Sequence, residues 1–329
     1  MSMILLLFAA PGQGTKNCFI DSIYSFGDSI ADTGNLLQQG PVGLFAPIGR
    51  YPYGKTMNKS TGRCSDGLLM IDYFALNLNL SLIDPYLLDG ADFRSGVNFA
   101  VAGSTALDSS VLLQRSIIAP VTNKPLSVQL QWFKTHLNST CSSSPTECSK
   151  KLEHALILMG EIGGNDYNNA FFQGSSIDSV KSFVPRVVDR IVDAAKEVID
   201  AGAVQLVIPG NFPIGCMPSY LTMFYNSDPS AYDDNKCLKD YNSFAMYHNK
   251  QLQAAIEQLR QSYPKITFMY ADYYQAFMYL LNHTAELVRF RQGFGAQGLL
   301  RSWRRLQLRL QFDVRSPRDD NMLGTNQVH

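Results

Sequence analysis

Ser29 is the residue of this sequence best placed to act as a nucleophile. It follows an apolar run that ends at Phe26, and it stands in a stretch of turn-forming residues that extends to Asn35. A strand that runs into a turn and then a helix presents a hydroxyl beyond its carboxyl end, where open α/β sheets place their active sites, close to the N–H groups of the helix start. The triplet Gly27-Asp28-Ser29 alone favours an ordinary turn or helix cap, because Ser and Asp are common there for structural reasons.

Two further segments place small or polar residues directly after an apolar strand. One leads into Gly103 and Ser104, and the other into Gly163-Gly164-Asn165-Asp166. Because the carboxyl ends of parallel strands meet at one edge of a sheet, we expect both segments to lie beside Ser29. A backbone N–H at a glycine and an Asn carboxamide are donors that the oxyanion of a tetrahedral intermediate needs. The three segments together predict a serine nucleophile with an oxyanion hole.

The pattern of apolar residues predicts the elements that position these segments. Apolar runs typical of buried strands alternate with helical spacing, and such alternation is typical of parallel sheets with right-handed crossovers. The expected strands are residues 20–26, the first part of 96–106 before a glycine turn, 154–159, 204–208 and 266–270. The expected helices are 66–80, 127–137, 178–201, 234–262 and a short one ending at 281. No Pro/Gly/Ser-rich linker divides the 329 residues, so we expect a single α/β domain.

The charge balance argues against two classes of partner. Lys and Arg number 28, and Asp and Glu also number 28. A chain without net charge generates no field that would hold nucleic acid or an anionic membrane surface. We therefore expect a small neutral or mixed-charge substrate, and neither nucleic acid nor an integral membrane association.

Three features favour secretion over a cytosolic protein with inert buried thiols. Residues 1–13 include the apolar run 4–10, which is too short to span a bilayer and predicts a signal peptide, although no basic region precedes it. The six cysteines form an even set, and the polar loop between Cys141 and Cys148 would suit a disulfide, while the other four can pair in several ways. Four Asn-x-Ser/Thr sequons are candidate glycosylation sites. The other cysteines are Cys18, Cys64, Cys216 and Cys237, and the sequon asparagines are Asn58, Asn79, Asn138 and Asn282.

Residues 26–35, 98–107 and 159–167 closely resemble the first three sequence blocks of the plant GDSL esterase/lipase family of SGNH hydrolases, and within it the branch of acetylajmalan- and sinapine-type esterases. Residues 62–67, 209–216, 241–242 and 248–249 add lesser agreements, so that the resemblance covers about residues 18–285. It implies a flavodoxin-like three-layer α/β/α fold with a parallel sheet, secretion, and hydrolysis of small esters without a metal or an organic cofactor.

The resemblance also implies a role for each matching residue. Ser29 would be the nucleophile, and its own N–H would join the Gly103 N–H and the Asn165 side chain in the oxyanion hole. Four acidic or amide residues would order the surrounding loops rather than titrate in catalysis. These loop-ordering residues are Asp28, Asp32, Asn35 and Asp166.

The last sequence block of the family departs from this chain. A serine needs a histidine within hydrogen-bond reach that a carboxylate orients, and the family supplies both from an Asp-x-x-His motif near the C-terminus. No Asp-x-x-His occurs here; the nearest match is Asn326-Gln327-Val328-His329, which makes His329 the candidate base. An Asn can hold an imidazole, but it does not stabilise imidazolium as a carboxylate does, and in the serine-protease template that loss costs about four decades in turnover.

The other four histidines have less suitable positions. His248 falls inside a predicted long helix, where a packing role is expected. His136 and His283 lie near predicted helix ends, and His154 begins a predicted strand at the end opposite the site. None of them is expected to serve as the base.

The C-terminal composition differs from the rest of the chain. Residues 286–329 contain eight Arg and no Lys, whereas residues 1–285 contain thirteen Lys and seven Arg. The segment 301–312 predicts either a basic amphipathic helix or no stable structure. A change of reading frame or splice junction soon after Leu287 would explain both the tail and the missing motif, and we expect the C-terminal part of the fold to be incomplete.

Two functions therefore remain open from the sequence. The first is a secreted serine carboxylic-ester hydrolase that forms an acyl-enzyme on Ser29 and is impaired by loss of the Asp/His pair. The second is a non-catalytic ester-binding relative or truncated gene product with an oxyanion hole but no general base. A flavodoxin-like phosphate binder is disfavoured, because no phosphate-loop pattern with its lysine is present. The sequence indicates no oligomeric state.

Overall fold

The computed structural model describes residues 19–40, 43–141 and 145–283. The expectations for residues 1–13, Cys18, the tail 286–329 and His329 lie outside the described residues.

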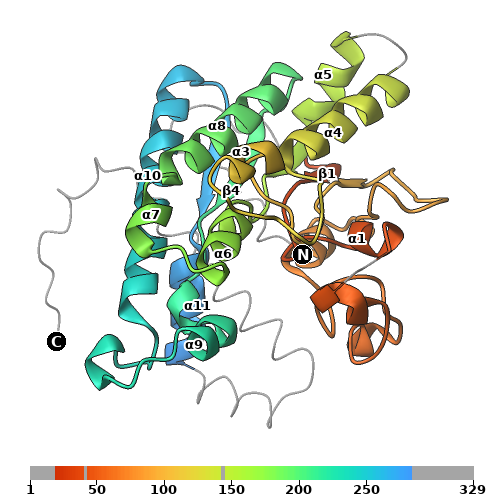
Figure 1. Ribbon diagram of the computed structural model, residues 1–329. Coiled ribbons are helices and arrows are strands. Elements are labelled where there is room, and N and C mark those ends of the chain that lie inside the picture. The colour runs from red at the N-terminus through yellow and green to blue at the C-terminus, as the bar shows by residue number, and fades with distance from the viewer. Residues whose placement is uncertain (1–18, 41–42, 142–144, 284–329) are drawn as a thin grey trace, which may run out of the picture.

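Within the described residues, a parallel sheet of five strands forms the centre of the fold (Figure 1). In order across the sheet it contains β2 (Gly96–Asn98), β1 (Ser22–Ser25), β3 (Ala155–Leu158), β4 (Gln205–Pro209) and β5 (Thr267–Ala271). Tyr24 of β1 lies beside Val97 on one side and Ile157 on the other, and every neighbouring pair is parallel. The order 2-1-3-4-5 is that of flavodoxin-like folds, which confirms the predicted fold class.

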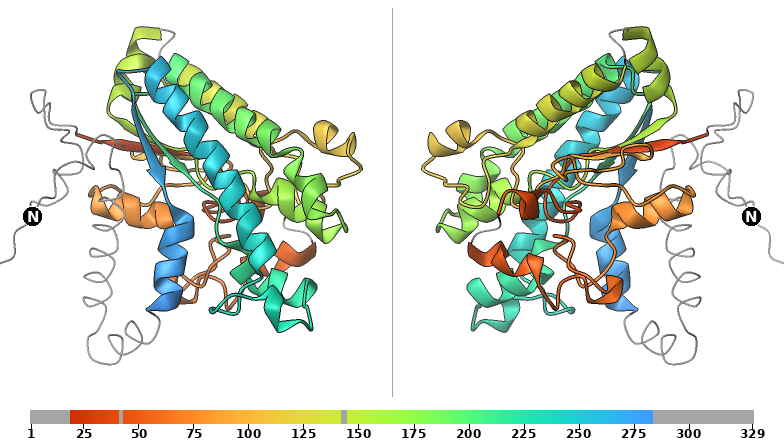
Figure 2. Two further views of the ribbon diagram at one scale, coloured as in Figure 1. Left: turned by 90° about the vertical axis from the view of Figure 1, so that its left-hand side faces the viewer. Right: turned by 90° about the vertical axis from the view of Figure 1, so that its right-hand side faces the viewer.

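Helices cover both faces of this sheet and give it three layers, α/β/α. The long helices α4 (Leu126–Thr140), α8 (Val184–Asp200) and α10 (Lys239–Ser262) lie on one face, and α2 (Met70–Asn77) lies on the other (Figure 2). In α8 the buried residues recur at spacings of three and four, so that one apolar stripe packs against the sheet.

The core divides between the two faces in the same way. Under the long helices, Tyr24 and Phe26 of the first strand segment and Phe99 pack against Phe133 of α4. Under α2, aliphatic side chains such as Ile23 fill a smaller core. Because both faces are covered, β1 to β4 are buried along their whole length, polar residues such as Ser25 and Asn98 included.

The remaining elements are shorter and mostly lie in the connections. They are the helices α1 (Asn35–Gln38), α3 (Ser109–Leu113), α5 (Pro145–Glu153), α6 (Gly164–Phe172), α7 (Ile177–Lys181), α9 (Pro218–Met223) and α11 (Tyr273–Asn282), and the 3-10 segments η2 (Gly43–Gly49), η3 (Lys55–Met57), η4 (Ile214–Cys216) and η5 (Pro229–Ala231).

Three predicted helices have different bounds in the structure. The helix expected from residue 66 begins at Met70, and the Asp72 carboxylate accepts the N–H of Leu69 at 2.8 Å in its first turn. The helix expected over 178–201 is divided into α7 and α8, with Pro185 in the first turn of α8, where a missing N–H is tolerated. The helix expected from residue 234 begins at Lys239.

Two disulfides occur among the described residues. Cys141–Cys148 joins the end of α4 to α5, and Cys216–Cys237 joins η4 to the segment before α10. Cys64 forms no disulfide with another described residue. All four sequon asparagines are exposed, and their glycosylation remains a prediction. No helix in the described ranges is long and apolar enough to cross a membrane.

Candidate active site

The turn of residues 28–32, called the nucleophile turn after the role predicted for Ser29, follows β1 closely. The N–H groups of Ala31 and Asp32 donate to the carbonyl of Asp28 at 3.1 and 2.9 Å, so that Ser29 lies within a single tight turn and is half-buried. The helix expected directly after this turn is α1, which begins only at Asn35 and has four residues. Its first N–H groups donate to the Asp32 carboxylate, so these groups are already paired within the fold.

Gly27 directs the chain into this turn. Its φ of 135° lies in the region that favours glycine, and a Cβ at this position would lie 3.0 Å from the carbonyl oxygen of Glu161. The buried side chain of Gln129, on α4, accepts the Gly27 N–H at 2.9 Å and donates to the Gly27 carbonyl at 2.8 Å. This pair of hydrogen bonds fixes the backbone just before Ser29.

Asp32 and Asn35 tie the nucleophile turn to the chain that leaves β2. The Asp32 carboxylate accepts four backbone N–H groups at 2.6 to 3.1 Å, and the last of them belongs to Ala102. Burial raises the pKa of Asp32 to about 6, while these N–H groups act in the opposite direction. Asn35 donates to the carbonyls of Asn98 and Ala100, both at 2.8 Å. The nucleophile turn and the loop that leads to Gly103 are thereby joined.

Gly103 occupies a position that admits only glycine without rearrangement. Its φ is 84°, and a Cβ there would lie 2.5 Å from the Cβ of Val121. Gly103 is buried, yet its N–H donates no hydrogen bond to a described residue, and neither does the N–H of Ser29. Most buried N–H groups in native proteins have a partner, so an unpaired one calls for an explanation. Both N–H groups are free to bind an acceptor from outside the fold.

Asn165 lies between the two loops. It stands in the first turn of α6, and its Nδ2 donates to the Asp28 carboxylate at 2.8 Å and to the carbonyl of Ser104 at 3.0 Å. The next residue, Asp166, accepts the N–H groups of Ala106 and Leu107 at 2.7 and 2.9 Å and so ties α6 to the loop beyond Gly103. Burial raises the pKa of Asp166 to about 7.

The three segments named from the sequence therefore meet at one edge of the sheet. Ser29 follows β1 and Asn165 follows β3, and these neighbouring strands flank the point where the strand order reverses. Open α/β sheets bind their ligands in the crevice at this switch point. The Asn165 carboxamide contacts the residue before Ser29 and the residue after Gly103.

Glu161 is part of the site and was missed from the sequence. It is 6% exposed, and its carboxyl group hydrogen-bonds with that of Asp28. Burial raises the pKa of both groups, to about 6 for Asp28 and well above the usual range for Glu161, and the neighbouring carboxylate raises that of Glu161 further. At neutral pH the two carboxyl groups share a proton, because two adjacent buried carboxyls do not both ionise. The only sequence signal was a charged residue directly after a buried strand.

None of the described histidines contacts Ser29. His248 is buried, with its Nδ1 2.7 Å from the hydroxyl of Tyr167, and burial lowers its pKa to about 4. His136 is buried among aromatic rings, and burial likewise lowers its pKa to about 4. His154 is exposed before β3, at the far end of the sheet, and His283 stacks on a tyrosine at the end of α11. Within the described ranges, the Ser29 hydroxyl has no hydrogen-bond partner.

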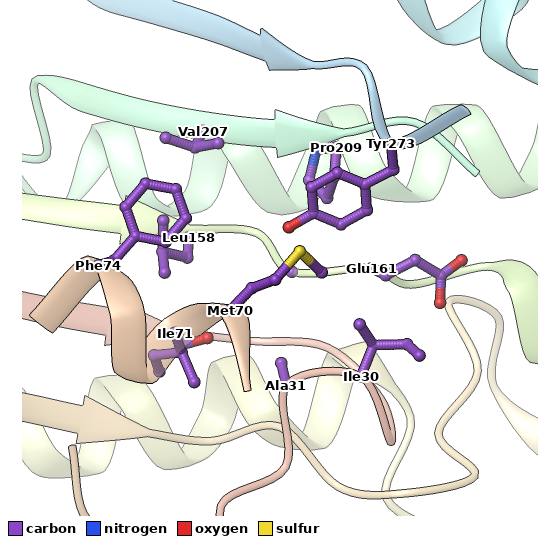
Figure 3. Close-up of a pocket in the computed structure, with 12 residues that line it drawn as sticks. Ile30, Ala31, Met70, Ile71, Phe74, Leu158, Glu161, Val207, Pro209 and Tyr273 are labelled. Atoms are coloured by element: carbon purple, nitrogen blue, oxygen red, sulfur yellow. The ribbon is translucent and has the colours of Figure 1, made fainter. Parts of the chain in front are cut away.

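A small pocket lies beside the nucleophile turn, on the α2 face of the sheet (Figure 3). The side chains of Ile30, Met70, Phe74 and Tyr273 point into it, and Glu161 lies at its edge with the carboxyl group directed away from the Tyr273 ring. The lining is mostly apolar. No group of His, Cys, Asp and Glu side chains among the described residues is arranged to hold a metal ion.

Comparison with known proteins assigns the family. The sequence profile described as GDSL-like Lipase/Acylhydrolase matches residues 23–295. This chain belongs to that family. A GDSL esterase/lipase of Arabidopsis thaliana is 44% identical over 279 residues, which cover 85% of this chain and 74% of the relative. Acetylajmalan esterase 1 of Rauvolfia serpentina is 42% identical over 298 residues, which cover 90% of this chain and 76% of the relative. Sinapine esterase of Brassica napus is 45% identical over 258 residues, which cover 78% of this chain and 66% of the relative.

Membership of the GDSL family confirms the resemblance seen in the sequence blocks. It also makes this chain, at the level of the family, a hydrolase acting on ester bonds. Acyl transfer by such an enzyme needs a nucleophile, donors for the oxyanion and a base. The described residues bring together candidates for the nucleophile and for the donors.

Proposed function

We propose that this chain hydrolyses small acyl esters through an acyl-enzyme on Ser29. The observation that carries the proposal is the meeting of a serine hydroxyl with two backbone N–H groups that lack acceptors in the described part of the chain, those of Ser29 and Gly103. The Asn165 carboxamide, linked to both loops, adds a third donor. Such preplaced donors stabilise the negative charge that develops on a carbonyl oxygen when a nucleophile attacks it.

The reaction proceeds in two steps. Ser29 Oγ bonds to the ester carbonyl carbon, its proton passes to a base, and the resulting oxyanion accepts hydrogen bonds from the donors. The bond to the alcohol oxygen then breaks, the alcohol leaves with a proton, and the acyl group remains on Ser29. Water attacks the acyl carbonyl in the same way, releases the acid and restores the Ser29 hydroxyl.

Asn165 has to change partners during this reaction. Both hydrogens of its Nδ2 are engaged, one with the Asp28 carboxylate and one with the Ser104 carbonyl. One of them must turn toward the oxyanion or be shared with it. The carboxylate of Asp28 and the turn around it would then serve to hold Asn165 ready rather than to take the proton of Ser29.

His329 is the candidate base in this proposal, and Asn326 stands where the family has Asp. Asn326 would orient the imidazole without stabilising its charged form. We therefore propose an impaired enzyme, slower by about 10⁴-fold than one with an intact Asp-x-x-His motif.

Ester binding without turnover is the second candidate function. It is favoured by a separate observation, since no described residue hydrogen-bonds to the Ser29 hydroxyl and no described histidine lies against it. A chain with a formed oxyanion hole and no working base would hold an ester and release it unchanged.

We also propose that the protein is secreted. Two disulfides among the described residues and four exposed sequon asparagines support this, because disulfides persist in oxidising compartments. The signal peptide proposed for residues 1–13 would direct the export.

Hydrolysis of p-nitrophenyl acetate by three full-length chains tests the proposed activity. We expect Ser29→Ala to be the slowest, the wild type to be faster, and Asn326→Asp, which completes an Asp-x-x-His motif, to exceed the wild type by at least about ten-fold. Equal rates in all three chains would overturn the hydrolase proposal. Binding of an unreactive ester analogue to such an inactive chain, measured by calorimetry, would then support the binding function instead.

A further inference from the structure

The carboxamide of Asn165 is held from two sides. On one side its Nδ2 donates to Asp28 and to the Ser104 carbonyl. On the other side its Oδ1 accepts a hydrogen bond from Nδ2 of Asn168 at 3.4 Å. Asn168 lies three residues later in α6, and residues at that spacing share one face of a helix. Oδ1 of Asn165 therefore has an anchor on the helix itself.

Asn168 is in turn oriented by Tyr220, on α9. The Tyr220 hydroxyl donates to Oδ1 of Asn168 at 2.6 Å, which directs the Nδ2 of Asn168 toward Asn165. Burial raises the pKa of Tyr220 above its usual range, so the hydroxyl keeps its proton and can donate. Because the oxygen and nitrogen of an amide occupy opposite sides of one planar group, each bond in this chain sets the direction of the next.

Tyr220 is a rigid end point for the chain of hydrogen bonds. Its side chain is 2% exposed, and the disulfide Cys216–Cys237 fixes the backbone just before α9. Four aromatic rings surround the Tyr220 ring, with centroid distances of 5.2 to 6.1 Å. They belong to Phe171, Phe172, Phe224 and Tyr241.

We propose that Tyr220 and Asn168 are positioning residues that keep the Asn165 carboxamide directed at the oxyanion during ester hydrolysis. The inference rests on the proposed function. When one Nδ2 hydrogen leaves Asp28 or Ser104 for the oxyanion, the bond from Asn168 to Oδ1 opposes rotation of the amide group together with the Nδ2 bond that remains. This bond is 3.4 Å long, above the usual range of about 2.7 to 3.2 Å, and we expect it to shorten when the ester binds.

Tyr220→Phe is the sharpest variant, because it removes one hydroxyl and leaves the ring in place. Tyr241→Phe is its matched control: Tyr241 lies in the same aromatic cluster, and its hydroxyl forms no hydrogen bond with Asn165 or Asn168. Asn168→Ala removes the hydrogen bond to Asn165 directly, at a half-buried position.

The first readout does not depend on turnover. In ¹H–¹⁵N spectra of the full chain, the side-chain amide signals of Asn165 are assigned by their loss in Asn165→Ala. We expect Tyr220→Phe and Asn168→Ala to shift or broaden these signals and Tyr241→Phe to leave them in place. Unchanged Asn165 signals in both Tyr220→Phe and Asn168→Ala would overturn the inference, whatever the activity of the chain.

The second readout is the kinetics of p-nitrophenyl acetate hydrolysis. Tyr220→Phe should lower kcat by about five- to ten-fold with KM unchanged, which is the effect of one neutral hydrogen bond that acts in the transition state. In an Asn165→Ala background, Tyr220→Phe should have no further effect, because the two residues act in series. A full, additive loss in that background would refute action through Asn165. If Ser29→Ala and the wild type hydrolyse the ester equally, the proposed function fails, and the amide spectra alone decide the inference.

Discussion

Replacing Gly103 with alanine should weaken the fold and the site together. Gly103 has a φ of 84°, and a Cβ built there would lie 2.5 Å from both the Cβ and the Cγ1 of Val121. Atoms do not approach so closely, so the loop has to move away from Val121. Since the Gly103 N–H is one of the proposed oxyanion donors, that donor moves with the loop.

The size of the effect follows from two separate costs. The left-handed φ costs alanine roughly 1 to 2 kcal/mol. Relief of the overlap with Val121, whose branched side chain has few alternative rotamers, costs roughly 1 to 3 kcal/mol more. Together they lower the free energy of unfolding by roughly 2 to 5 kcal/mol. A displaced oxyanion donor costs about 3 kcal/mol of transition-state stabilisation, which is about 10²-fold in kcat.

Gly174→Ala is the matched control for this variant. Gly174 has a φ of 88°, but no atom lies within 4 Å of the position that a Cβ would take there, so only the backbone cost of roughly 1 to 2 kcal/mol applies. Urea unfolding followed by fluorescence measures both variants, and p-nitrophenyl acetate hydrolysis measures their turnover. Adding Val121→Ala to Gly103→Ala removes the contact with Cγ1 but leaves the Val121 Cβ in place, so it should recover only part of the stability that the overlap removes.

Two results would refute this reasoning. Equal losses of stability in Gly103→Ala and Gly174→Ala would show that Val121 does not crowd Gly103. Full turnover in a folded Gly103→Ala chain would show that the Gly103 N–H does not bind the oxyanion.

Three further predictions concern buried ionisable side chains. Arg63 and Asp72 form a buried ion pair with two hydrogen bonds of 2.9 and 2.7 Å. Arg63→Met should therefore lower the free energy of unfolding by about 3 to 5 kcal/mol in urea titrations. Arg94→Met, at an exposed ion pair, should change it little. Burial raises the pKa of Glu161 in the folded chain, so its contribution to stability declines as pH rises from the pKa of the unfolded chain toward that of the folded chain. The free energy of unfolding of Glu161→Gln, relative to that of the wild type, should therefore be higher at about pH 8 than at about pH 5. Burial lowers the pKa of His248 to about 4, so its contribution to stability is complete above the pKa of the unfolded chain and is lost as pH falls, by about 3 kcal/mol in all. Between about pH 7 and pH 4, His248→Gln should therefore lose less stability than the wild type. Equal losses would contradict burial of His248 as the cause.

The meeting of Ser29, Gly103 and Asn165 was predictable because each follows a buried strand. The strands β1 to β4 are buried along their whole length in a sheet covered on both faces, and in a parallel sheet their carboxyl ends share an edge. That rule needs only the position of each motif relative to its strand, and both are visible in the sequence.

Contacts between distant side chains were not predictable in the same way. Glu161 stands among glycines and an isoleucine, where a carboxyl is typical of an exposed loop, and its burial depends on the nucleophile turn that packs over it. Tyr220 and Asn168 are 52 residues apart and meet only because α9 packs against α6. No local pattern of residue types encodes such a meeting.

The start of the helix after Ser29 was not predictable for a related reason. The Asp32 carboxylate binds the N–H groups of Gly34, Asn35 and Leu36, and these bonds delay the first helical turn to Asn35. One further N–H in the same set comes from Ala102, far along the chain. A contact of that kind overrides the local preference for a helix and is visible only in the folded structure.

Covalent labelling of Ser29 tests the central claim most directly. The full-length chain is treated with a fluorophosphonate, and the adduct is located by mass spectrometry of the intact chain and of its peptides, with Ser29→Ala as the control and Asn326→Asp as the chain with a completed motif. The proposed acyl-enzyme predicts a single adduct on Ser29, formed faster in Asn326→Asp and absent from Ser29→Ala. An adduct on another residue, or none in either the wild type or Asn326→Asp, would contradict the assignment of Ser29 as the nucleophile.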